Sequence, residues 1–246
     1  MKKMFLSIIV LITLTLLSSA CVTIGRTNNT ASIRGTGDMV SRDFQVDNFY
    51  AIDISGAYVV TYTQSQASSL TVEMQENLFQ HLDVEVRNGT LYVSSNRTFN
   101  VTAANMPRLY IYTSSLQEAS FAGAVEASNW DIISTQNFTL NAAGGSSINI
   151  GLDVEHFELG VAGGTSIELY GNATTAYISG AGGLSVSAER LQTRDATVSV
   201  AGAGNVTIAV SDNLNATIAG VGTIRYIGNP TVTRSVTGLG SVRRQD

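Results

Sequence analysis

The feature that most constrains the fold of this chain is a short motif that recurs between residues 119 and 242. Each copy places an apolar residue, two glycines or small residues, and two more apolar residues at alternate positions, as in Ile218–Tyr226. Alternate side chains of a strand point to the same face, so each copy predicts a strand with one apolar, glycine-containing face. The first glycines of successive copies follow one another at steps of 17 to 22 residues: Gly144, Gly163, Gly180, Gly202, Gly220 and Gly238.

This period decides between repeat architectures. Propeller blades need about 40 residues, and leucine-rich repeats of similar period need a dense leucine signature that this chain lacks. No amphipathic segment is long enough to supply the helices of βαβ units. We therefore predict an all-β fold, a right-handed parallel β-helix (β-solenoid) with coils of about 18–22 residues.

The glycines have a structural explanation in such a stack. At a sharp corner, a side chain would collide with the coils above and below, whereas glycine has no Cβ and permits unusual dihedral angles. We expect the corners to align into a column of glycines. A phosphate-binding loop at Gly180–Gly183 is the alternative, but no predicted helix follows it and the motif occurs many times.

The region 47–115 predicts irregular strands and a hairpin ahead of the repeats at 119–242. Val84–Val93 forms the hairpin signal, because Asn88-Gly89 favours the positive dihedral angles of a type I′ turn. We predict further strands at Leu70–Met74 and Leu109–Ile111. An outlying copy of the motif lies at Ile54–Tyr62. We expect residues 47–246 to form one solenoid domain whose first part covers the N-terminal end of the stack.

The N-terminus predicts export. Lys2 and Lys3 precede an apolar run from Phe5 to Leu17, which is too short for a membrane-spanning helix. The lone cysteine, Cys21, follows small residues where cleavage is expected. We predict a lipoprotein signal peptide over 1–20 and a lipidated Cys21 on a polar tether over 21–46, which gives an extracytoplasmic, membrane-anchored protein. An ordinary cleaved signal with a chance cysteine is the alternative, since Ser18 occupies the position that usually holds leucine.

Composition excludes several classes of protein. Without residues 1–20, the chain has 12 arginines, 19 acidic residues and no lysine. It therefore lacks a Walker lysine, a Schiff-base lysine or a lysine general base. Low charge and an acidic balance argue against nucleic-acid binding. We expect no cofactor.

Outward positions of the repeats carry small polar residues. Three residues after the first glycine lies a ladder that we predict as an interaction face, for a surface glycan or an envelope protein: Ser147, Ser166, Asn205, Thr223 and Ser241. A second outward row changes from acidic to basic along the stack: Glu126, Asn149, Glu168, Ser185, Thr207, Arg225 and Arg243. The alternative is structural, because such ladders also suit a solvated sheet.

Two patterns could indicate chemistry. Asp153, Glu155, His156 and Glu158 are close in sequence, but in a strand the first two face away from the others, so we predict no metal site. Glu126 and Glu168 would lie two coils apart in one row, about 10 Å from each other, at the upper limit for a pair of glycosidase carboxylates. A carbohydrate-active solenoid enzyme, a polysaccharide lyase or hydrolase, is therefore the alternative to a non-enzymatic protein.

The motifs together resemble those of the head GIN domain family, which is described as auto-transporter adhesins. The resemblance rests on Phe49–Gly56, Asn88–Leu91 and the glycine copies up to Gly238-Leu239-Gly240, and it covers residues 47–242. It implies an all-β fold of β-helix type, common on exported proteins and lipoproteins, and an adhesin role without known catalytic residues. We therefore expect a non-enzymatic protein that contacts the membrane through its lipid anchor.

Overall fold

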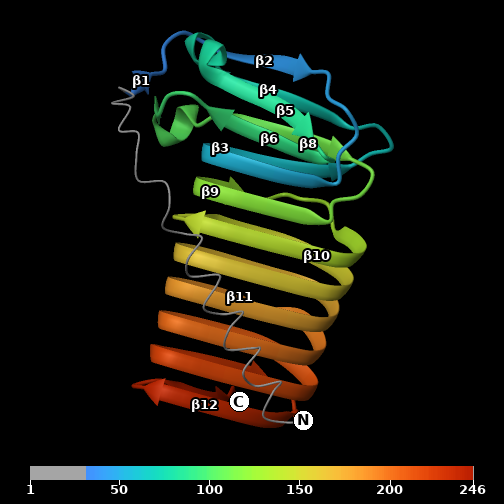
Figure 1. The fold of residues 1–246 in the computed structure, drawn as a ribbon, viewed down its shortest axis with the longest axis vertical. Helices are drawn as coiled ribbons and strands as arrows, with labels where there is room; N and C mark the ends of the chain where they lie inside the picture. Colours follow the sequence, from blue (N-terminus) through green and yellow to red (C-terminus); the bar gives the residue numbers. More distant parts are fainter. Residues whose placement is uncertain (1–31, 246) are drawn as a thin grey trace. The chain divides into compact units, whose positions relative to one another are not determined.

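The computed structural model describes residues 32–245, and this part of the chain is all-β, as predicted (Figure 1). Two short 3₁₀ helices, η2 (Glu76–His81) and η3 (Ala103–Asn105), are its only helical segments. Neither is long and apolar enough to cross a membrane. The strands are β1 (Ile33–Arg34), β2 (Met39–Phe44), β3 (Ala51–Gln64), β4 (Ser69–Gln75), β5 (Leu82–Arg87), β6 (Thr90–Ser95), β7 (Phe99–Asn100), β8 (Arg108–Thr113), β9 (Glu118–Ala127), β10 (Ile133–Gly144), β11 (Ser147–Ile227), β12 (Thr231–Gly238) and β13 (Ser241–Arg244).

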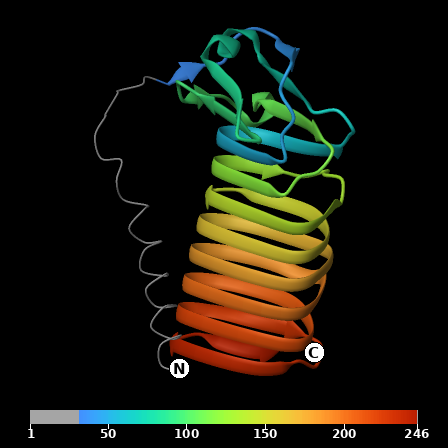
Figure 2. The same ribbon diagram turned by 45° about the vertical axis from the view of Figure 1, so that its right-hand side comes forward.

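The repeat region pairs in parallel with itself. β10 pairs with β9 and with the start of β11, and the end of β11 pairs with β12 and β13. In between, β11 winds through several coils without a break (Figures 1 and 2). Each coil lies one repeat further along the chain than the one it pairs with.

The predicted column of glycines is present. A Cβ built on Gly163 would lie 2.8 Å from the carbonyl oxygen of Gly144, and one built on Gly182 would lie 2.9 Å from that of Gly163. All corner glycines of the column have positive φ, which favours glycine. Successive members are 21, 19, 19, 20, 18 and 18 residues apart: Gly123, Gly144, Gly163, Gly182, Gly202, Gly220 and Gly238.

Two copies of the motif have a different register from the predicted one. Gly182, not Gly180, stacks on Gly163, so the copy at 178–186 is displaced by two residues. In the copy at 119–127, Gly123 rather than Phe121 occupies the corner. The displacement keeps every side chain on its predicted face because it is an even number of residues.

The outlying copy of the motif forms the first coil. β3 pairs in parallel with β9, and Gly56 lies opposite Gly123 although 67 residues separate them. The intervening segment covers β3 with β6 and β8, which are parallel to it. The pairs β2–β4, β4–β8 and β5–β6 are antiparallel, so the sheet as a whole is mixed rather than wholly parallel.

Local predictions for this N-terminal part are confirmed. β5 and β6 form the predicted hairpin, and both Asn88 and Gly89 have positive φ. β4 and β8 contain the two further predicted strands. The predicted tether is too long, because β2 lies inside it and pairs with β4. The predicted signal peptide, Cys21 and the rest of the tether to residue 31 lie outside the described residues.

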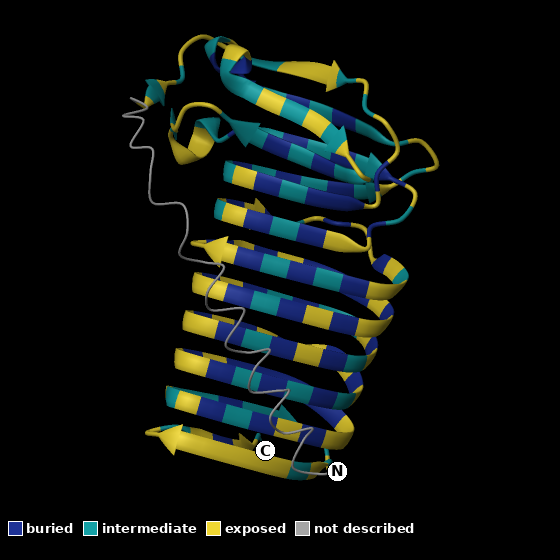
Figure 3. Ribbon diagram, in the orientation of Figure 1, coloured by how far each residue is buried: buried dark blue, intermediate teal, exposed yellow. Residues whose placement is uncertain are grey.

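Alternate burial along most strands builds the core, whereas β12 is almost wholly exposed (Figure 3). Inward side chains stack on those of the next coil, as in Phe138 and Phe157, whose rings are parallel within 10° and 6.2 Å apart. Trp130 closes the core near the first coil and donates an indole hydrogen bond to the Val60 carbonyl at 2.8 Å. Outward positions remain free to form surface columns.

Candidate functional site

Each coil of the repeat region has two long faces and a short edge. Face 1 consists of the outward side chains that precede the glycine corners: residues 137–143, 156–162, 175–181, 195–201, 213–219 and 231–237. Face 2 consists of those that follow the corners: residues 147–150, 166–170, 185–189, 205–209, 223–226 and 241–244. The short edge connects face 2 to face 1 of the next coil and consists of residues 134–136, 153–155, 172–174 and 192–194.

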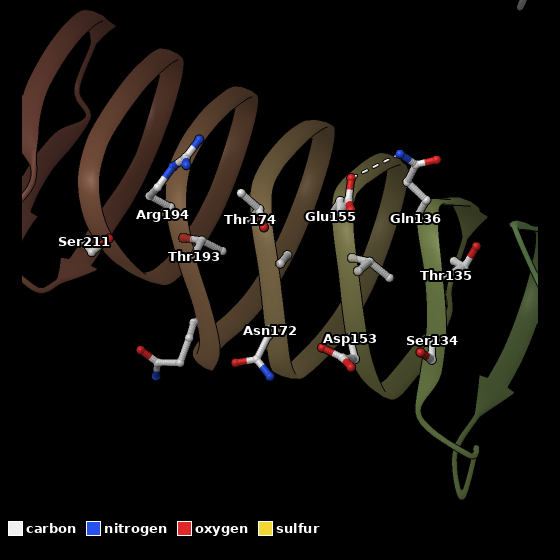
Figure 4. A pocket seen from close by; sticks show the side chains of 13 residues that line it. Ser134, Thr135, Gln136, Asp153, Glu155, Asn172, Thr174, Thr193, Arg194 and Ser211 are labelled. Atoms are coloured by element: carbon white, nitrogen blue, oxygen red, sulfur yellow. Dashed lines mark hydrogen bonds between the residues drawn. The ribbon is translucent and has the colours of Figure 1, made fainter.

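A hollow of about 690 Å³ runs along the short edge (Figure 4). Its floor carries small side chains such as Ala173 and Thr193, and the Thr193 hydroxyl donates inward to the Ala209 carbonyl at 2.6 Å. Polar side chains form a row on each side, with Asp153 and Asn172 in one of them. The hollow therefore extends across several coils rather than converging on one point.

The other row of the short edge is already paired within the protein. Gln136 donates to a carboxylate oxygen of Glu155 at 3.2 Å, and Arg194 donates to Asp195 at 2.8 Å. Asp195 also accepts from the Asn213 amide at 2.6 Å. The hydrogen bond from Asn213, followed by that from Arg194, lowers the pKa of the Asp195 carboxyl. Asp195 is therefore an ionised, oriented acceptor where the short edge meets face 1.

The predicted ladder lies on face 2. Thr223 is opposite Ser241, and the Ser241 hydroxyl donates to that of Thr223 at 3.5 Å. The Ser166 backbone N–H donates to Ser146, which places Ser166 beside Ser147. Ser147, Ser166 and Asn205 are exposed and make no side-chain hydrogen bond within the described residues. These groups are free to bind a ligand.

The corrected register extends this ladder. Because Gly182 is the corner, Ser185 rather than Gly183 lies three residues after it and occupies the ladder position of its coil. Glu126 occupies it in the first repeat, since Glu126 lies opposite Ser147. The signal that could have identified both was the spacing: steps of 19 and 20 residues around Gly182 are more even than 17 and 22 around Gly180, and the step from Gly123 to Gly144 is 21 residues rather than the 23 from Phe121.

The same correction separates the two candidate carboxylates. Glu126 belongs to the ladder, whereas Glu168 lies in the next column, where the Asn149 amide donates to it at 3.2 Å. Glu168 also accepts from Arg190 at 2.5 Å. The prediction that Glu126 and Glu168 share one row is therefore wrong, as is the placement of Ser185 in that row. Thr207, in the same row, is buried.

The histidines make local hydrogen bonds. His156 on face 1 pairs through Nδ1 with the Thr175 hydroxyl at 2.7 Å, and His81 pairs with Asn96 at 3.0 Å. Asp153 and Glu155 lie on the short edge, away from the face that carries His156. Among residues 32–245, no three His, Cys, Asp or Glu side chains gather closely enough to hold a metal ion. The segment Gly180–Gly183 lies within β11 and opens no helix.

Comparison with known proteins identifies relatives. A family model described as "Putative auto-transporter adhesin, head GIN domain" matches residues 48–230. No curated protein matches the chain. The structure of a putative adhesin from Bacteroides fragilis is similar, with 24% identity and a TM-score of 0.78 over 87% of this chain and 100% of that one.

Two Parabacteroides structures are also similar, each over 87% of this chain. A putative lipid binding protein from Parabacteroides distasonis has 24% identity and a TM-score of 0.70, over 100% of that chain. A putative adhesin from Parabacteroides merdae has 22% identity and a TM-score of 0.68, over 99% of that chain. At these identities the likeness establishes the fold alone.

Proposed function

The chain belongs to the head GIN domain family, and we propose that it is a non-enzymatic, adhesin-like module that a lipidated Cys21 holds at the bacterial membrane. In this proposal the domain is displayed outside the cytoplasm and binds a surface glycan or an envelope protein through its outward polar columns. The role ascribed to the family favours a surface location.

The ladder on face 2 is the observation that carries the binding role. Parallel coils are about 4.8 Å apart, so the ladder offers a hydroxyl or amide group at that interval along the stack. Several of these groups have no partner among the described side chains. An extended ligand such as a glycan chain can contact many such groups at once, which multiplies weak contacts.

A right-handed parallel β-helix is the architecture that suits this role. It is supported by the parallel pairing of β9, β10, β11 and β12 and by the glycine column. The rigid stack holds the ladder straight without any ligand, so little ordering entropy opposes binding.

The separation of Glu126 from Glu168 supports a non-enzymatic role. Glycoside hydrolysis needs two carboxylates that face each other across a sugar. Here one carboxylate stands in the ladder, and the other is paired with Arg190 in a different column. We therefore favour binding over turnover.

The binding role is tested by electrophoresis of the full-length chain, solubilised in a non-ionic detergent. The gels contain mannan, dextran, laminarin or alginate. We expect at least one polymer to retard the chain without loss of polysaccharide stain. Ser166→Tyr should weaken that retardation by blocking the ladder, and Gln66→Tyr, in the exposed loop after β3, is the matched control. Cleared zones would contradict the non-enzymatic proposal.

Membrane fractionation tests the anchor separately. We expect Cys21→Ala to release the chain from the membrane fraction and Thr23→Ala, which keeps the cysteine, to leave it there. Retention of the Cys21→Ala variant would contradict anchoring through this residue.

A further inference from the structure

Tyr177 has an exposed aromatic side chain that is not part of the hydrophobic core. It points outward from face 1 with 46% of its surface exposed. Within the described residues its side chain makes no hydrogen bond, ion pair or ring contact. The other exposed tyrosine, Tyr50, differs, because its hydroxyl donates to the Asn88 carbonyl at 3.2 Å in the hairpin turn.

The neighbours of Tyr177 are short and polar. They form a shallow hollow of about 400 Å³ over four coils of face 1, together with the tyrosine ring. Thr197 follows Tyr177 in its column, and Ser179 follows it in its strand. The side chains of the hollow that concern binding are Thr175, Asp195, Thr197, Asn213 and Asn215.

Two polar groups of the hollow are held in fixed positions. The Asp195 carboxylate accepts from Asn213 at 2.6 Å and from Arg194 at 2.8 Å, while Asn213 keeps its amide oxygen as an acceptor. Such oriented acceptors can receive hydrogen bonds from hydroxyl groups without reorganisation.

An aromatic ring beside a carboxylate and amides matches the chemistry of a sugar. The face of the ring carries partial negative charge and attracts the C–H bonds on one face of a pyranose. The equatorial hydroxyls of the same sugar can donate to the Asp195 carboxylate in the next coil and to the amide oxygen of Asn213, which is bonded to it. A protein anchor would instead need a well-packed apolar surround for the ring, and hydroxyl and amide groups line this hollow.

Charge restricts the ligand further. Glu158 precedes Tyr177 in its column, and the Asp195 carboxylate lines the hollow itself. An anionic sugar would be repelled there. We propose that Tyr177, with Asp195 and Asn213, forms a subsite on face 1 that stacks and hydrogen-bonds one uncharged pyranose of a glycan. This subsite rests on the proposed glycan-binding function and is separate from the ladder on face 2.

The test uses the same gels of neutral mannan, dextran and laminarin, with anionic alginate beside them. Tyr177→Ala should weaken retardation by the neutral polymer about tenfold or more, whereas Tyr177→Phe, which keeps the ring, should retain most of it. Tyr50→Ala removes an equally exposed tyrosine that lies outside both faces and is the matched control. Circular dichroism verifies that each variant is folded.

The outcomes separate the two proposals. If a polymer retards the wild-type chain and Tyr177→Ala leaves that retardation unchanged, the subsite is overturned and the glycan-binding function stands. The same conclusion follows if only Ser166→Tyr weakens the retardation. Retardation by alginate alone overturns the uncharged ligand. Failure of every polymer to retard the wild-type chain overturns both.

Discussion

The side chain of Leu184 fills the space beside Gly204 in the next coil: a Cβ on Gly204 would lie 2.8 Å from the Leu184 Cγ. Leu184 is buried, and it occupies the position that Ser146 and Thr165 hold in earlier coils. Those two hydroxyls donate to the carbonyls of the preceding corner glycines, at 3.4 and 3.3 Å. Leucine cannot form this hydrogen bond. Its larger side chain fits because Gly204 in the next coil has no Cβ.

Gly204→Ala should therefore destabilise the fold through overpacking, by about 1–3 kcal/mol. Leu184→Ala should cost about 2–5 kcal/mol by leaving a cavity. The double variant should be less destabilised than the sum, because alanine at 184 makes room for the Cβ at 204. Urea unfolding of the four proteins measures the coupling, and strict additivity would contradict this contact.

The position of Leu184 also shows which part of the fold could not be predicted from the alternation of residues in the sequence. The alternation of apolar and small residues determines which side chains face inward, and that part of the prediction is confirmed. Gly180 and Gly182 both fit the motif, and a shift of two residues preserves the alternation, so the alternation alone cannot choose between them. The more even spacing favours Gly182, whereas the packing of Leu184 against Gly204 of the next coil is a three-dimensional property that the sequence does not show.

The surface sites also differ in how far they could be predicted from the sequence. The ladder could be predicted because each member lies three residues after a corner glycine. Asp195 and Asn213 also keep a constant offset, since each lies seven residues before a corner glycine. The spacing does not show, however, that these two side chains bond to each other or that the short edge is hollowed, because both depend on side-chain packing.

Adjacent glycines at one corner give a second prediction. Gly163 has a φ of +115° and faces the Gly144 carbonyl, whereas a Cβ on Gly164 would meet nothing within 4 Å. Gly163→Ala should destabilise the domain by about 2 kcal/mol or more, from the unfavourable dihedral angle and the backbone clash. Gly164→Ala should change stability by less than about 0.5 kcal/mol. Equal urea midpoints for the two variants would contradict the role of the glycine column.

Tyr58 gives a prediction for alkaline pH. Its side chain is completely buried in the first coil, and its hydroxyl has no hydrogen-bond partner among the described residues. Burial raises the pKa of Tyr58 to about 12, from 10 for an exposed tyrosine; the nearby Ser95 side chain opposes this rise, and the Asp83 charge adds to it. The unfolded chain therefore loses this proton at lower pH than the folded one. The contribution of Tyr58 to stability is complete below pH 10 and is lost as the pH rises towards 12.

Tyr58→Phe removes this ionisation and should flatten the fall of stability between pH 10 and 12. Near neutral pH the variant should be about as stable as the wild type, since the lost hydroxyl makes no bond. Chemical unfolding at a series of pH values, followed by fluorescence of the single tryptophan, Trp130, measures both effects. Tyr92→Phe is the control, because the Tyr92 side chain is only partly buried. A slope that Tyr58→Phe leaves unchanged would show that Tyr58 does not govern alkaline unfolding.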